Sequence, residues 1–305
     1  MEVKTKSVSR RYAINEFKTV GLVLIIYCLF VLYVPLVLEE ALPLIGFTTY
    51  MGFNVSFIAS ILCLIIGTLI PFMLLRVRSK KKLRDFNHPL DIGLNDLLVY
   101  YVVFFVISAG TIFITMMIGQ YVNVGGKLVS GIGIAINEAY LKDIIYIITF
   151  IVISPVLEEY AFRGVLLNCL SRYGKYFATI ASSLIYALAH GSFVEMIPSF
   201  FMGYILSKIS LYHKSIKPAI FMHVLFNLSL YALFLIPERF TLNVMAVLAL
   251  MIILAVILIL TKTYRVLKVR KSGTNKQVGI MFLTTAPVMM ALILFVLHSV
   301  LLMII

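Results

Sequence analysis

Two adjacent glutamates, Glu158 and Glu159, lie in a stretch that otherwise has the composition of a membrane-spanning helix. An ionisable side chain near the centre of a bilayer costs roughly 2.5–3.5 kcal/mol, so such residues indicate a functional site. Arg163 follows Glu159 by four positions, which is the favourable order for an ion pair on one helix face. Glu158 points roughly 100° away on the same helix. We therefore expect Arg163 to hold Glu159 in a structural pair and to leave Glu158 as a general base.

Two further polar patterns follow along the chain, in segments that are again mostly apolar. Tyr186 precedes His190 by four positions, and His223 precedes Asn227 by four, so the members of each pair share a helix face. Histidine can act as a base or a metal ligand, and both histidine and asparagine can stabilise an oxyanion. The same residue types can also simply join membrane helices by hydrogen bonds. We expect these side chains and Glu158 to converge on one buried cavity.

The three patterns together resemble the motifs of the CAAX-protease and bacteriocin-processing family, also called the Abi family. Members of this family are intramembrane endopeptidases, and the resemblance covers residues 143–235. The chain has Tyr186 where the family usually has phenylalanine, a change that keeps the aromatic ring. Any one of the three patterns is weak by itself, whereas their order along the chain makes the resemblance specific.

The resemblance implies a role for each of these residues. Glu158 and His190 would activate a water molecule for attack on the scissile carbonyl. His223 and Asn227 would donate hydrogen bonds to the oxyanion, an effect worth about 3–4 kcal/mol per donor in other hydrolases. The residues expected to support this site are Glu159, Arg163 and Tyr186.

The cofactor is expected to be either none or a divalent metal such as zinc. Two histidines and a carboxylate are ligand types that zinc uses, so the candidate metal ligands are Glu158, His190 and His223. The family resemblance admits both zinc and metal-free glutamate catalysis. No His-Glu-x-x-His pattern occurs in the sequence, which favours the metal-free alternative.

These residues must be positioned by membrane helices. The chain has 305 residues, of which 62% are hydrophobic and only 13% charged, and its mean hydropathy is +1.06. Such a composition predicts an all-α polytopic membrane protein with about eight to nine transmembrane helices. Nine apolar segments have the length needed to cross a hydrocarbon core of roughly 30 Å. They are residues 20–38, 55–75, 97–118, 143–168, 176–191, 195–211, 217–235, 241–261 and 279–303.

The net charge of +13 reflects membrane topology and not nucleic-acid binding. If the N-terminal tail is cytoplasmic, 22 of the 26 Lys and Arg residues fall in the inner segments. This distribution follows the positive-inside rule, and the excess also favours contact with anionic lipid head groups. The sequence therefore predicts a multi-pass protein of the cell membrane, with the lipid bilayer as a partner and no nucleic acid. The composition is typical of a bacterium with an AT-rich genome.

The charges also divide the chain into three parts. Residues 1–96 hold a tail, two spans and a basic cytoplasmic loop, with no ionisable residue inside the spans. Residues 97–235 form the expected catalytic core, with all three motifs within 143–235. Residues 241–305 add two C-terminal spans to which the resemblance assigns no role. His298, in the last of them, has no acidic neighbour and is expected to be a packing residue.

Three classes of function follow from these features. The first is an endopeptidase, of glutamate type or metal-dependent, that acts on a hydrophobic peptide or a membrane-protein substrate. The second is a non-catalytic membrane regulator or bacteriocin self-immunity protein that uses the same helices. The third is a transporter with the glutamates as an ion site, although the sequence has no visible internal repeat. Because every catalytic-type position is intact, the sequence favours the endopeptidase.

Overall fold

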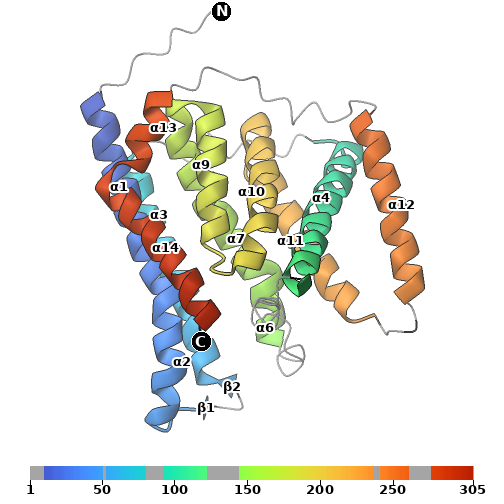
Figure 1. Ribbon diagram of the computed structural model, residues 1–305, viewed down its shortest axis with the longest axis horizontal. Coiled ribbons are helices and arrows are strands. Elements are labelled where there is room, and N and C mark those ends of the chain that lie inside the picture. The colour runs from blue at the N-terminus through green and yellow to red at the C-terminus, as the bar shows by residue number, and fades with distance from the viewer. Residues whose placement is uncertain are drawn as a thin grey trace, which may run out of the picture.

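The computed structural model describes residues 10–50, 53–79, 92–121, 144–236, 239, 241–260 and 276–304. In these ranges the chain is almost entirely helical (Figure 1). The described strands, β1 (Thr49–Tyr50) and β2 (Phe53–Asn54), form one short antiparallel hairpin. The prediction of an all-α membrane protein is confirmed, with this hairpin as a small addition.

The helices largely follow the predicted apolar segments, with π-helical or 3-10 turns inserted at several points. They are α1 (Arg10–Cys28), η1 (Leu29–Tyr33), α2 (Val34–Leu44), α3 (Val55–Arg78), α4 (Leu94–Tyr121), α6 (Ile144–Ile148), η3 (Thr149–Ile153), α7 (Ser154–Glu158), η4 (Glu159–Leu167), α8 (Asn168–Leu170), η5 (Ser171–Tyr173), α9 (Lys175–Leu188), α10 (Phe193–His213), α11 (Lys217–Phe234), α12 (Thr241–Leu260), α13 (Lys276–Leu283) and α14 (Ala286–Ile304).

Three predicted spans differ from the helices that form. The first is part of a longer helical segment of 35 residues, Arg10–Leu44. The fifth, predicted to reach residue 191, ends at Leu188 because Gly191 adopts a positive φ of 73° that terminates the helix. The ninth is divided into α13 and α14 just before Pro287, which lacks the N–H that would continue the helix.

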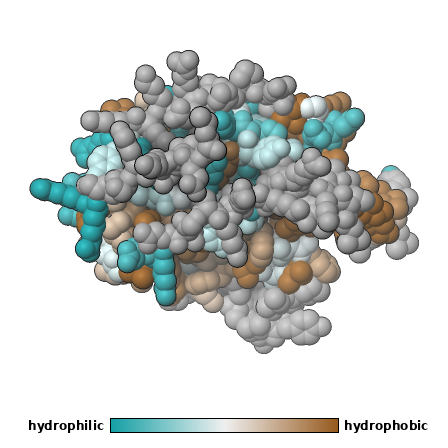
Figure 2. Space-filling view, turned by 90° about the horizontal axis from the view of Figure 1, so that it is seen from above, coloured by the Kyte–Doolittle hydropathy of each residue, from teal (hydrophilic) through white to brown (hydrophobic). Residues whose placement is uncertain are grey.

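Among the described residues, four helical segments are long and apolar enough to cross a membrane by length and composition. They are Arg10–Leu44, Val55–Arg78, Leu94–Thr115 and Ala286–Met303, while the apolar helix Lys217–Leu233 is shorter. The count of nine spans therefore remains a prediction. Hydrophobic side chains extend to the rim of the molecule (Figure 2), and the outer surface includes exposed Leu74, Leu250 and Met290, as expected for contact with lipid.

The core joins the outer helices to the helix that carries the glutamates. Helix α14 packs along α1, α3 packs on α1 and η4, and α10 packs between α9 and α4 (Figure 1). Tyr27 of α1, Phe72 of α3 and Phe162 of η4 meet with ring centroids 5.6–5.8 Å apart. Phe162 is fully buried and lies only three positions after Glu159, so this aromatic cluster packs beside the helical segment that carries the glutamates.

One buried carboxylate lies in α1, outside the span that the sequence predicted there. Glu16 is 7% exposed and accepts hydrogen bonds from the Tyr173 hydroxyl and, at 3.2 Å, from the Cys169 thiol. Its Oε1 atom also lies 3.2 Å from Nη1 of Arg172. Burial raises the pKa of Tyr173, and the hydrogen bond to Glu16 raises it further, so the phenol remains a donor. These contacts join α1 to the turn that precedes α9.

Candidate active site

The two glutamates lie at a change in helix geometry. Glu158 is the last residue of α7, and Glu159 begins η4, a π-helical stretch of nine residues. Such π-helical segments often occur at functional sites. Glu159 and Arg163 are fully buried, whereas the Glu158 side chain retains 18% exposure. The pair that looked alike in sequence therefore occupies two different environments.

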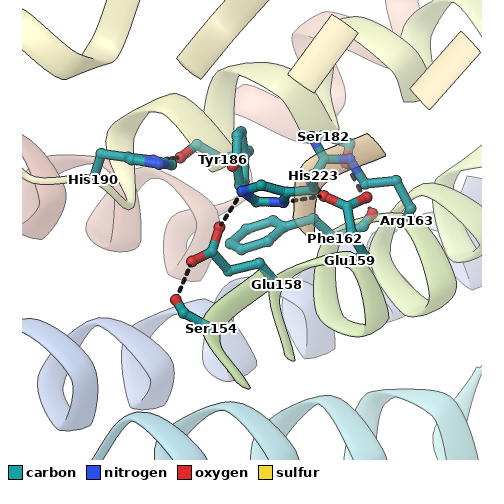
Figure 3. A network of polar contacts seen from close by, with 9 residues as sticks. All are labelled: Ser154, Glu158, Glu159, Phe162, Arg163, Ser182, Tyr186, His190 and His223. Carbon is teal, nitrogen blue, oxygen red and sulfur yellow. Dashed lines mark hydrogen bonds and ion pairs between the residues drawn. The ribbon is translucent and has the colours of Figure 1, made fainter. Parts of the chain in front are cut away.

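Glu159 is the centre of a buried ionic network (Figure 3). Its Oε1 atom lies 2.7 Å from Nη1 of Arg163, which confirms the contact predicted from their spacing. The same oxygen lies 2.9 Å from Nδ1 of His223 on α11. An ionised carboxylate can only accept hydrogen bonds, so both nitrogens donate to it. Glu159 therefore orients the imidazole of His223 as well as pairing with Arg163.

Tyr186 forms one wall of this network. The guanidinium carbon of Arg163 lies 4.1 Å from the centre of the Tyr186 ring, a cation–π contact. A Cβ atom on Gly203 of α10 would lie 3.0 Å from this ring and 3.3 Å from the Arg163 guanidinium. Gly203 therefore leaves space for the stacked pair. The cation–π contact uses only the aromatic ring, which a phenylalanine at this position would also provide.

Glu158 has one satisfied and one unsatisfied carboxylate oxygen. The Ser154 hydroxyl donates to Oε1 at 2.5 Å. The other oxygen, Oε2, is buried without a hydrogen-bond partner and lies 3.9 Å from Nε2 of His223 (Figure 3). His190 acts on Glu158 only at longer range. The sequence paired Glu158 with His190, whereas the structure places His223 next to it.

His190 lies in the turn just beyond the end of α9, and not within the helix as predicted. Its backbone N–H bonds to the carbonyl of Ala187, and its side-chain Nδ1 lies 2.8 Å from the carbonyl oxygen of Tyr186. A carbonyl can only accept, so Nδ1 carries the proton and Nε2 of the neutral ring carries the lone pair. His190 therefore caps its own helix through one nitrogen and presents the other to its surroundings.

Asn227 connects α11 to the helix of the glutamates. Its amide nitrogen donates to the carbonyl of Phe150 at 2.9 Å. In the π-helical turn η3 the N–H of Ser154 bonds to Thr149, and residue 155 is a proline without an N–H. Asn227 thus donates a hydrogen bond to the Phe150 carbonyl, to which Pro155 cannot donate because it has no N–H. One amide hydrogen is committed to this contact, and the amide has a second.

One carboxylate of the site was missed by the sequence interpretation. Glu195, in the first turn of α10, lies within electrostatic range of both His190 and Glu158. The available signal was an acidic residue at the start of an apolar segment, close behind a histidine. Glu16 was missed for a different reason, because it precedes the predicted first span.

The assignment of a metal to Glu158, His190 and His223 stays a prediction. Within the described residues, no three His, Cys, Asp or Glu side chains are placed to hold a metal ion. His223 uses Nδ1 for Glu159, and His190 uses Nδ1 for a carbonyl of its own helix. A metal-ligating histidine usually donates its other ring N–H to a carboxylate or carbonyl, so these Nδ1 contacts leave both Nε2 atoms available to a metal, to water or to substrate.

Comparison with known proteins places this site in a family. A family model described as type II CAAX prenyl endopeptidase Rce1-like matches residues 140–229, which contain all three motifs. The chain is 30% identical over 210 residues to the membrane-embedded CAAX protease MroQ of Staphylococcus aureus (strain USA300). This alignment covers 64% of the chain and 81% of that protein. No solved structure matches the chain. On this similarity, the chain belongs to the CAAX-protease and bacteriocin-processing family.

Proposed function

We propose that the protein is an intramembrane endopeptidase in which Glu158 activates a water molecule to hydrolyse a peptide bond. The observation that carries this proposal is the unsatisfied, buried Oε2 of Glu158, 3.9 Å from Nε2 of His223. This separation is too long for a direct hydrogen bond, and a water molecule beside Oε2 can donate to that oxygen. A carboxylate facing such a water is placed to accept its proton.

The proposed reaction has two proton transfers. Glu158 takes a proton from the water as the water oxygen bonds to the scissile carbonyl carbon. Nε2 of His223, in its protonated form, and the second amide hydrogen of Asn227 donate to the resulting oxyanion. Glu158 then returns the proton to the amine as the C–N bond breaks. His190 orients water or substrate through Nε2, and Glu159 holds His223 in place.

The proposed substrate is a hydrophobic peptide or a membrane-protein segment. The site lies among apolar helices, and the relative MroQ is named as a membrane-embedded CAAX protease. Peptide pheromones and bacteriocin leaders fit this class. Prenylated C-termini fit the description of the family model, but such tails are not expected in a bacterium. We further propose a multi-pass location in the cell membrane with a cytoplasmic N-terminus.

The test is proteolysis by the purified full chain in lipid vesicles. The probes are a quenched library of apolar single-span peptides and isolated bacterial membranes whose new protein termini are identified by mass spectrometry. We expect cleavage by the wild type and none by His190→Asn. Asparagine can keep the hydrogen bond to the Tyr186 carbonyl but has no group at the Nε2 position, so folding should be unaffected.

Two outcomes would contradict the proposal. If neither the library nor the membranes contain a product that depends on the wild-type chain, the non-catalytic regulator is the better reading. If His190→Asn retains the wild-type rate, His190 serves only as a helix cap.

Metal analysis of the active preparation should find much less than one zinc per chain, and a stoichiometric metal would replace the metal-free mechanism.

A further inference from the structure

We propose that His298 of α14 is a positioning residue for His190, because its ring supports the Gly191 turn that carries this histidine. The effect on catalysis rests on the function proposed above, whereas the effect on the turn does not. The family model ends at residue 229, so α14 lies outside the region that it describes. Helix α14 would thereby have a role at the site.

The contact between α14 and the turn is direct. Gly191 follows His190 and has a φ of 73°, which a residue with a side chain rarely adopts. A Cβ atom at this position would lie 2.7 Å from Cδ2 and 2.9 Å from Nε2 of His298. It would also lie 3.6 Å from the Leu302 side chain, one helical turn further along α14. The His298 ring thus fills the space that the missing side chain leaves.

His298 is held firmly on its other side. The Tyr33 ring of η1 packs edge-on against it, with centroids 5.3 Å apart. The Tyr33 hydroxyl donates to the carbonyl of Leu294 at 2.7 Å, one turn before His298. His298 itself is only 4% exposed. A rigid connection therefore runs from the N-terminal helix through α14 to the turn beside His190.

His298 supports the Gly191 turn through the shape of its ring, and this support does not depend on the protonation of the imidazole. Its Nδ1 atom is buried and has no hydrogen-bond partner among the described residues. Its contacts with Gly191 and Tyr33 are van der Waals and aromatic contacts. We therefore expect that a phenyl ring at this position can replace the imidazole.

The consequence for catalysis follows from the geometry of His190. Its Nδ1 atom is fixed to the helix end, but the backbone that carries the ring depends on the conformation of the Gly191 turn. A displacement of a catalytic group by about 1 Å can lower a rate about 100-fold. Loss of the support should therefore reduce kcat more than it changes KM.

The experiment compares three variants of the full chain in lipid vesicles. His298→Ala removes the support, His298→Phe retains a ring, and Phe295→Ala removes a buried ring from the same helix that packs against Tyr27. Cleavage of the best peptide from the library above gives kcat and KM. Hydrogen–deuterium exchange of the peptide that covers residues 189–192 reports on the turn, whose backbone N–H groups are bonded to Ile185, Ala187 and Leu188.

We expect His298→Ala to lower kcat about 10- to 100-fold, to leave KM within twofold and to speed exchange at the turn. His298→Phe should restore the wild-type kcat and the wild-type exchange rate at the turn. Phe295→Ala should lower thermal stability without speeding exchange at the turn. Unchanged exchange in folded His298→Ala, or failure of His298→Phe to restore protection, would overturn the proposal. If the wild type cleaves nothing, the proposed function fails, and the exchange comparison still decides whether His298 supports the turn.

Discussion

At the scale of single residues, the two glutamates are adjacent in the chain but have different partners. Glu159 is enclosed with Arg163 and His223, whereas Glu158 has an unsatisfied oxygen directed toward the same histidine. Both histidines are anchored at Nδ1 and present Nε2. Glu159 and Arg163 are thus enclosed by their partners, whereas Glu158, His190 and His223 are the side chains that we propose to act on water and substrate.

The buried Arg163 should be essential for stability. Arg163→Ala would leave the charge of Glu159 buried without its guanidinium, at a cost of about 3–5 kcal/mol. We expect a large fall in thermal unfolding temperature in detergent. Tyr186→Phe is the matched control, because it keeps the ring that stacks on Arg163 and removes only the hydroxyl. If Arg163→Ala were as stable as Tyr186→Phe, Glu159 could not depend on this pair.

The residue scale is also where sequence reasoning was strongest. The Glu159–Arg163 contact depends on a separation of four positions within one helix, which the sequence contains. The contact of His223 with Glu159 spans 64 positions and depends on helix packing. Periodicity cannot reveal such a contact, and the pairing of Glu158 with His190 rested on the family resemblance. The roles assigned to Glu158, His190, His223 and Asn227 remain predictions.

At the scale of secondary-structure elements, irregular helix geometry shapes the site. The π-helical turns η3 and η4 flank α7, and the turn after α9 carries His190. Pro155 and Gly191 are both visible in the sequence as breaks in helical hydrogen bonding. The sequence does not show that η3 forms π-helical hydrogen bonds, which join residues five positions apart. The hydrogen bond from Asn227 to Phe150, which depends on that π-helical pattern, could not be predicted.

The link between Pro155 and Asn227 can be tested by a double-mutant cycle. Asn227→Ala removes one donor from the Phe150 carbonyl and should cost about 0.5–1.5 kcal/mol of stability. Pro155→Ala adds a backbone N–H five positions after Phe150, so we expect it to reduce that cost. The measurements are thermal unfolding and peptide cleavage for both single variants and the double variant.

The cycle also separates the two roles of Asn227. If Asn227 donates to the oxyanion as well, the double variant should regain stability without regaining cleavage. Full recovery of cleavage would limit Asn227 to its contact with Phe150. Strict additivity of the two stability changes would contradict the proposed link.

At the scale of the whole molecule, polar contacts gather segments that the basic residues predicted to lie on one side of the membrane. Arg172 donates to the Tyr12 hydroxyl at 2.9 Å and to the carbonyl of Ser79 at 2.8 Å. These residues belong to the start of α1, the end of α3 and the turn before α9. Their meeting at one end agrees with the topology that the charges predict. The helical class followed from composition, whereas the packing of α14 on α1 did not.

The topology can be tested with a reporter fused after Ile305. We expect the reporter to map outside the cytoplasm, because nine crossings starting from a cytoplasmic N-terminus end on the outer side. A second fusion, within the basic segment 262–271, should map to the cytoplasm. A cytoplasmic reporter after Ile305 would mean that one predicted span, with α10 the first candidate, does not cross the membrane.

We propose Glu158 as the base that activates water. The most direct measurement is the cleavage rate of Glu158→Gln beside Glu39→Gln, a control at an exposed glutamate of α2. Glutamine can still accept the hydrogen bond from Ser154 but cannot take a proton from water. We predict a rate at least about 100-fold below wild type for Glu158→Gln, a wild-type rate for Glu39→Gln, and similar unfolding temperatures for both. Cleavage by folded Glu158→Gln at the wild-type rate would contradict the claim.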